Sequence, residues 1–211
     1  PLKVDCGAGF GEPVHVTRTI REVEAAGIAC IHIEDQHYPK RAHYHLGRER
    51  VIDAEAMVDK IRAAVGARRD KDLVLVGRTD AMLTDGVAEG IRRGNLYAEA
   101  GCDMIEVFPN TVEEARIAAK EIDAPLVYVN ASGDFADLGR PNIRWHDLEE
   151  MGYKLCLDAT TVIMSAVDAV RNAMRTYLAD GYPPAHIANN TEIRGYIDNI
   201  IGLPEYYEIE R

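Results

Sequence analysis

The segment IACIHIEDQHYPKRAHYHLGRER, residues 28–50, is the stretch from which the fold is best inferred. It opens with a mostly apolar run, typical of a strand buried on both faces, and this run ends at the carboxylates Glu34 and Asp35. A loop rich in His, Lys and Arg follows. Functional side chains of α/β barrels gather where the parallel strands end, so the segment predicts a site at this strand end. A solvated loop after a strand is the alternative interpretation.

Two other predicted strands also end in charged side chains. A strand at residues 2–5 ends at Asp5, and a strand at residues 72–79 carries Arg78 near its end, with Asp80 directly after it. Three such strand ends in succession favour a barrel, because the chemistry of a barrel collects on the rim formed by the carboxyl ends of its strands.

Strand and helix patterns alternate along the chain without a linker-like break. Strands are predicted at 2–5, 28–34, 72–79, 104–108, 126–130 and 154–157, and helices at 13–26, 53–68, 86–100, 112–122, 146–151 and 160–179. Repeated strand–helix–strand units require a parallel sheet with right-handed crossovers. The predicted fold class is therefore α/β, a (β/α)8 TIM-type barrel, with a doubly wound parallel sheet as the alternative.

The number of units suggests an incomplete barrel. A complete barrel has eight units in roughly 250 residues, whereas this chain of 211 residues gives six and opens in the middle of a strand. We expect the first two units to be missing from it. Residues 1–182 are expected to form barrel units three to eight, and residues 183–211 a C-terminal segment that contacts another subunit.

Composition narrows the class of protein. The formal net charge of −11 gives no basic surface for nucleic acid and disfavours anionic membranes. No apolar stretch approaches the roughly 20 residues of a membrane span. The four cysteines have no CxxC spacing and lie mostly in or beside apolar runs, as expected for reduced, buried thiols of a cytoplasmic protein. A processed or preceding N-terminal segment stays open, because the chain starts at Pro1.

Several motifs together resemble a known family. They are VDCGAGFG (4–11), REVEAAGIACIHIEDQ (21–36), PKR (39–41), MVDKIRAAVGAR (57–68), GRTDA (77–81) and YAEAGCDMIEVF (97–108). On these motifs the sequence resembles the phosphoenolpyruvate mutase/isocitrate lyase superfamily over essentially its whole length. The resemblance implies a (β/α)8 barrel whose last helix is often exchanged between subunits. It also implies a Mg²⁺-dependent enzyme that makes or breaks C–C or P–C bonds of small 2-oxo or 2-hydroxy acids through an enolate-type intermediate.

The same resemblance implies roles for the charged residues. Asp5 matches the residue that ligates Mg²⁺ directly, and Glu34 matches a carboxylate that holds the ion through water. Lys40 matches a catalytic lysine of a loop, and Arg78 matches the arginine that grips a substrate carboxylate, for which a guanidinium fork is well suited. Further positions expected to contact the substrate are Gly7, Glu106 and Asn130.

The chain departs from the family pattern at two places. Gly7 stands where the family's DxDxGxG turn has its second Asp, so metal affinity is expected to fall and a metal-free site stays open. Ala42 stands where the lyases have the Cys that acts as acid or base, and Ala can do neither. We therefore expect that this is not a typical Cys-dependent isocitrate or methylisocitrate lyase. A different proton-transfer group is expected from His43, Tyr44 or His45, with His43 as the candidate catalytic residue.

Plainer interpretations stand beside these roles. Asp5 would cap the following turn, Glu34 and Asp35 would form salt bridges at the rim, and His32 would be a satisfied core histidine. A His-rich metal site is a further alternative, since four of the seven histidines lie close together, at 32, 37, 43 and 45.

The function expected from the sequence is a Mg²⁺-dependent lyase or mutase acting on a small 2-oxo or 2-hydroxy carboxylic acid or a phosphonate analogue. The expected assembly is a homodimer or homotetramer with exchange of the C-terminal helix, without nucleic acid or membrane partners. The alternative is a non-catalytic relative whose barrel is a binding or assembly module, and the residues found at positions 7 and 42 are what that reading predicts.

Overall fold

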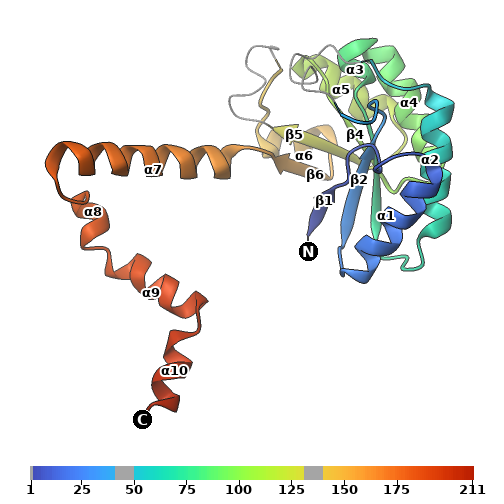
Figure 1. Cartoon of the computed structure of the whole chain (residues 1–211). Helices are drawn as coiled ribbons and strands as arrows, with labels where there is room; N and C mark the ends of the chain where they lie inside the picture. Colours follow the sequence, from blue (N-terminus) through green and yellow to red (C-terminus); the bar gives the residue numbers. More distant parts are fainter. Residues whose placement is uncertain (1, 41–49, 131–139) are drawn as a thin grey trace. The chain divides into compact units, whose positions relative to one another are not determined.

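The structure, a computed structural model, describes residues 2–40, 50–130 and 140–211 (Figure 1). The chain divides into two compact units, residues 1–161 and residues 162–211. Each unit is treated by itself below. The sequence analysis instead assigns residues 1–182 to barrel units and residues 183–211 to a C-terminal segment, and that assignment stays a prediction.

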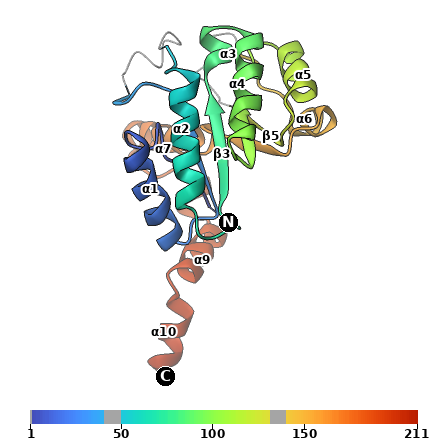
Figure 2. The ribbon, with the colours of Figure 1, turned by 90° about the vertical axis from the view of Figure 1, so that its right-hand side faces the viewer.

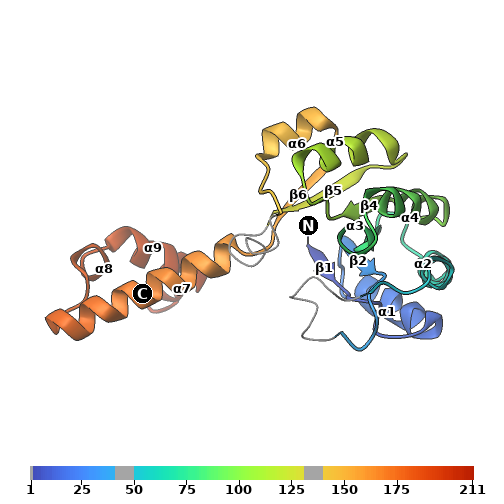
Figure 3. The ribbon, with the colours of Figure 1, turned by 90° about the horizontal axis from the view of Figure 1, so that it is seen from above.

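The first unit is built on one parallel sheet of six strands that lie in chain order. The strands are β1 (Lys3–Asp5), β2 (Cys30–Glu34), β3 (Val74–Thr79), β4 (Met104–Val107), β5 (Leu126–Asn130) and β6 (Leu155–Asp158). Each strand pairs in parallel with the next one along the chain. A doubly wound sheet would reverse its strand order at a switch point. The observed order and the curl of the sheet confirm the α/β prediction as a curled parallel half-barrel (Figure 3).

Helices cover the outer side of this sheet. They are α1 (Pro13–Ala25), α2 (Ala54–Ala67), α3 (Ala81–Thr84), α4 (Val87–Glu99), α5 (Val112–Glu121) and α6 (Trp145–Met151). Figure 2 shows α1, α2 and α4 side by side along the sheet. The sequence did not predict α3, which begins in a turn where the backbone N–H of Ala81 donates to Thr79 Oγ1 at 3.1 Å. This short helix lies between β3 and the predicted helix.

Side-chain alternation along the strands separates the core from the site. In β2, Ile31 and Ile33 are fully buried and belong to a cluster with Val16, Ile20 and Met57 of the covering helices. Because successive side chains of a strand point to opposite faces, His32 and Glu34 lie on the other face, inside the curl. The outer face therefore stabilises the fold, and the inner face is left for polar side chains.

The second unit consists of helices. It contains α7 (Thr161–Asp180) beyond its first residue, followed by α8 (Ala185–Ala188), α9 (Thr191–Ile200) and α10 (Leu203–Ile209). The sequence predicted the long helix but none of the three short ones. Apolar side chains of α7 such as Val162, Val170 and Leu178 are exposed in this chain.

Two further expectations concern cysteines and membranes. Cys6, Cys30, Cys102 and Cys156 are free thiols, two of them buried and two half-buried. Cytoplasmic location itself stays a prediction. Within the described ranges, no helix combines the length and the hydrophobicity that a membrane span requires.

We expect Gly90→Ala to destabilise the first unit, because α4 approaches α3 closely at this glycine. A Cβ at position 90 would overlap Met82 Cγ and lie 3.1 Å from the Met82 backbone nitrogen. Overpacking of this kind costs about 1–3 kcal/mol. Gly66→Ala in α2 is the matched control, since its Cβ would meet nothing within 4 Å, and it should leave stability unchanged or raise it by up to ~1 kcal/mol. Urea unfolding measures both, and equal free energies of unfolding would contradict this packing.

Candidate active site on the inner face of the sheet

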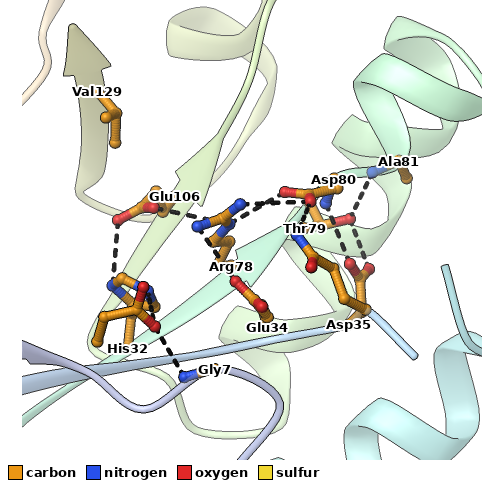
Figure 4. A network of polar contacts seen from close by, with 12 residues as sticks. Gly7, His32, Glu34, Asp35, Arg78, Thr79, Asp80, Ala81, Glu106 and Val129 are labelled. Carbon is orange, nitrogen blue, oxygen red and sulfur yellow. Dashed lines mark hydrogen bonds and ion pairs between the residues drawn. The ribbon is translucent and has the colours of Figure 1, made fainter. Parts of the chain in front are cut away.

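Polar side chains from neighbouring strands surround one hollow on the inner face. The hollow has a volume of about 390 Å³ and is lined by Lys3, Asp5, His32, Arg78, Glu106, Val129, Leu157, Asp158 and Ala159. Most of its charged side chains come from β1 to β4, and the rest of the lining combines the apolar Val129, Leu157 and Ala159 with Asp158. Figure 4 shows the charged groups facing one another across these strands.

Asp5 ends β1 and stands at the edge of the hollow. Its Oδ1 accepts the backbone N–H of Gly7 at 2.7 Å and lies 2.9 Å from Nε2 of His32. The interaction with His32 and the Gly7 N–H hold the pKa of Asp5 well below its usual range, against the opposing effect of burial. About half of the Asp5 side chain is exposed. An ionised, accessible carboxylate of this kind suits a metal ligand.

Glu34 ends β2 and is completely buried. Its Oε1 lies 2.9 Å from Lys40 Nζ, and its Oε2 lies 3.1 Å from Arg78 Nη1. Neither oxygen has an aligned hydrogen-bond partner within the part of the chain that the structure describes. Buried polar atoms in native proteins are nearly always hydrogen-bonded, so Glu34 is the group whose surroundings best fit an additional ligand, such as a water or an ion.

Arg78 is held in place by Asp80. Nε of Arg78 donates to Asp80 Oδ1 at 3.0 Å and Nη2 donates to Oδ2 at 3.3 Å, and the guanidinium lies 4.4 Å from the ring centre of Phe108. Gln36 donates to the same Asp80 carboxylate. Asp80 therefore positions the arginine.

Glu106, Lys3 and His32 form the floor of the hollow. Lys3 Nζ donates to Glu106 Oε2 at 2.7 Å and lies 2.8 Å from Nδ1 of His32. His32 is buried, as expected for a core histidine, but its partners belong to the site. The sequence analysis did not single out Lys3. The signal available was its position two residues before Asp5, which places both side chains on the same face of the strand.

Asp35 points away from the hollow and has a structural role. It is fully buried and accepts hydrogen bonds from Thr79 Oγ1, Tyr97 OH and Arg93 Nη1 at 2.7, 2.8 and 3.2 Å, and from the backbone N–H of Asp80 at 3.0 Å. Burial raises the pKa of Asp35 to about 6, with a further contribution from the Asp80 carboxylate. These bonds tie the ends of β2 and β3 to α4. The salt bridge expected for Asp35 is thus made with Arg93.

Of the remaining predicted residues, some lie at the site and others do not. Lys40 contacts Glu34, as described above. Asn130 donates from Nδ2 to the backbone carbonyl of Ile143 at 2.8 Å and accepts the backbone N–H of Ile143 at Oδ1 at 3.0 Å. It is not among the residues that line the hollow. His43 and Ala42 lie outside the described residues. The substrate contacts predicted for Gly7, Glu106 and Asn130 stay predictions.

The residues present fit a hard divalent cation. Ligand atoms of Asp5, His32 and Glu34 all lie within 4.8 Å of one another. Two carboxylates supply the oxygen ligands that Mg²⁺ prefers, and Mg²⁺ usually keeps several of its waters. The buried Glu34 oxygens without aligned partners are the observation that favours an ion here.

Gly7→Asp is expected to raise the affinity for Mg²⁺. Gly7 has φ +51°, a strained backbone conformation for most side chains that Asp adopts more readily than others, and a Cβ there would meet nothing within 4 Å, so there is room for a second carboxylate. An additional ligand charge should tighten binding by about tenfold. Gly27→Asp is the matched control, because Gly27 has φ +70°, equally open surroundings and a place far along the chain from Asp5. Calorimetric titration with Mg²⁺ checks this, and unchanged affinity in the Gly7 variant would contradict an ion at Asp5.

Comparison with known proteins finds similar proteins over nearly the whole chain. The family model described as phosphoenolpyruvate phosphomutase matches residues 1–178. The chain is 37% identical over 210 residues to 2-methylisocitrate lyase of Aeropyrum pernix, covering 98% of this chain and 65% of that protein. It is 34% identical over 211 residues to 2,3-dimethylmalate lyase of Eubacterium barkeri, covering 100% and 71%. The chain thus spans only about two thirds of the length of these relatives.

Solved structures agree as well. An oxaloacetate acetylhydrolase in complex with the inhibitor 3,3-difluorooxalacetate has a TM-score of 0.86 and 26% identity, and the match covers 100% of this chain and 69% of that one. A phosphonopyruvate hydrolase in complex with oxalate and Mg²⁺ has a TM-score of 0.76 and 27% identity, covering 100% and 71%.

Proposed function

This chain belongs to the phosphoenolpyruvate phosphomutase family of the PEP mutase/isocitrate lyase superfamily, and on that premise we propose that it is a lyase or mutase acting on a small 2-oxo or 2-hydroxy carboxylic acid or a phosphonate analogue. The observation that carries the proposal is the buried Glu34 carboxylate, paired with Arg78 and Lys40 beside the ionised Asp5. We further propose that the six units correspond to the third to eighth units of a (β/α)8 barrel.

Arg78 would bind the carboxylate of the substrate. A guanidinium carries several N–H donors in a planar fork, so pairing with Asp80 is compatible with holding a ligand carboxylate. The fixed orientation on Asp80 and over Phe108 means that little side-chain entropy is lost on binding. Arg78 would thereby set the position of the bond that is made or broken.

Asp5 and Glu34 would hold Mg²⁺, which when bound supplies positive charge that stabilises the oxyanion of an enolate. Lys3 and Arg78 keep further positive charge at the hollow, and Val129 and Leu157 add apolar surface to its lining. Lys40, which contacts Glu34, would contact the substrate.

We propose that the reaction does not use a loop thiol. Ala42 cannot donate or accept a proton, so an acid or base at the enolate carbon must come from elsewhere. His43 is the proposed group, because imidazole titrates near neutral pH. This sets the chain apart from a Cys-dependent methylisocitrate lyase, in spite of its similarity to proteins of that name.

The test is turnover by the full-length protein with Mg²⁺ and a panel of acids, followed by proton and phosphorus NMR. The panel holds oxaloacetate, isocitrate, methylisocitrate, dimethylmalate, phosphonopyruvate and phosphoenolpyruvate. We expect turnover of at least one acid, and a loss of kcat/KM of about 100-fold or more in Arg78→Lys, which keeps the charge but not the fork. His43→Ala should lower kcat with little change in KM.

Arg92→Lys is the matched control for Arg78→Lys, because Arg92 is exposed on α4 and pairs only locally with Glu89 in the described contacts. Its kcat/KM should equal that of the unaltered protein. The proposal that the protein is an enzyme would be overturned by no turnover of any acid together with no rise in melting temperature from Mg²⁺ and oxalate. That result would favour the alternative of a binding or assembly module.

We also propose that the protein is a homodimer or homotetramer in which the C-terminal helices of one copy contact another copy. The exposed apolar side chains of α7 support this, since a helix with no buried residue of its own gains stability only by packing. Val170→Asp should lower the mass measured by light scattering to that of a monomer. Asn172→Asp, at an exposed polar position of the same helix, is the control, and an unchanged mass in both variants would contradict the contact.

A further inference from the structure

We propose that Lys3 fixes the tautomer of His32 and thereby sets the metal preference of the site, so that Asp5 and Glu34 hold the ion and His32 does not. The presence of an ion rests on the proposed function. The tautomer is a property of the chain alone, and it is tested separately.

The three side chains form a short line through the floor of the hollow. Lys3 Nζ lies 2.8 Å from Nδ1 of His32, and Nε2 of the same ring lies 2.9 Å from Asp5 Oδ1. An ammonium group can only donate hydrogen bonds, so Nδ1 must accept through its lone pair. The proton of the neutral ring is therefore on Nε2.

The contact with Asp5 supports the same assignment. The distance between Nε2 and Asp5 Oδ1 is short, but the two groups are not aligned as in a hydrogen bond. A lone pair on Nε2 at this distance from a carboxylate oxygen would be repelled, whereas an N–H is attracted. The Nε2 atom is buried, and it faces the group proposed to bind the metal.

His32 is thus arranged in the opposite way to a metal-binding histidine. In such histidines the ring nitrogen that does not bind the metal donates its N–H to a carboxylate, a carbonyl or a water. A carboxylate lies near that nitrogen, since Glu106 Oε2 is 3.7 Å from Nδ1, although this distance is longer than a hydrogen bond. However, Lys3 donates to both Glu106 and the ring, and so occupies the place of that N–H.

Removing Lys3 should reverse the ring. When an ion is bound, Nδ1–H would then be directed toward Glu106, and the Nε2 lone pair would bind the ion beside Asp5 and Glu34. The site would change from two carboxylates to two carboxylates and an imidazole. Imidazole favours ions such as Co²⁺ and Zn²⁺, whereas carboxylate and water favour Mg²⁺. Lys3 therefore acts as a positioning residue that keeps the site suited to a hard cation.

The first experiment measures the tautomer by nitrogen-15 NMR of the full chain without any metal. The His32 signals are assigned by their loss in His32→Gln. We expect the Nε2–H tautomer in the unaltered protein and in Lys3→Arg, which keeps a donor, and the loss of this single fixed tautomer in Lys3→Met. An Nδ1–H ring, or protonation of both nitrogens, in the unaltered protein overturns the proposal. This result stands even where Lys3→Met fails to fold, and it requires neither an ion nor turnover.

The second experiment measures Co²⁺ and Mg²⁺ binding by absorbance and calorimetric titration. Lys3→Met should raise the ratio of Co²⁺ to Mg²⁺ affinity by about tenfold, Lys3→Arg should leave it unchanged, and Lys3→Met combined with His32→Gln should lose the gain. An equal rise for both ions would mean that Lys3 acts only through its charge, and would overturn the proposed preference. Failure of every variant to bind either ion would overturn the metal site of the proposed function, while the NMR result still decides the tautomer.

Discussion

A carboxylate that is fully removed from water must be paired with positive charge, and the inner face of this sheet is organised around that constraint at Glu34. Lys40 reaches one oxygen and Arg78 reaches the other. The other side of the Arg78 guanidinium is held by the Asp80 carboxylate. Asp80 is in turn held by Asp35, which accepts the backbone N–H of Asp80. A chain of paired charges thus runs from the outer network at α4 to the hollow, and the position of each group depends on the next.

The strand ends are the part of this arrangement that the sequence predicts. Asp5, Glu34 and Arg78 each close a short apolar run, and strands of a parallel sheet bring such ends together without information about distant contacts. The alternation of Ile31 and Ile33 with His32 and Glu34 likewise separates core from site. Most predicted elements differ from the observed ones by one or two residues at their ends, as helix and strand boundaries commonly do.

What could not be predicted depends on partners that are remote in the sequence or on local turns. Lys3 is separated from Glu106 by 103 residues, and only the curl of the sheet brings the two together. A lysine in an apolar strand otherwise suggests an edge or a solvent-facing position. The short helix α3 begins at a local turn in which Ala81 donates its backbone N–H to Thr79 Oγ1. The amide of Asn130 is used to hold the backbone at Ile143, which a strand-end position alone does not reveal.

The energetics of the inner face bear on whether the barrel is an enzyme or a module. Burying an ion costs several kcal/mol even after relaxation, and replacing buried ion pairs by apolar side chains is often neutral or stabilising. Glu34, Arg78 and Glu106 are all at least nine-tenths buried on the face that does not build the core. A barrel kept only for assembly would gain stability by losing these charges, since its outer face already supplies the packing. Action on a ligand gives these inner-face charges a function that offsets their cost, and this is the physical reason for preferring the catalytic interpretation.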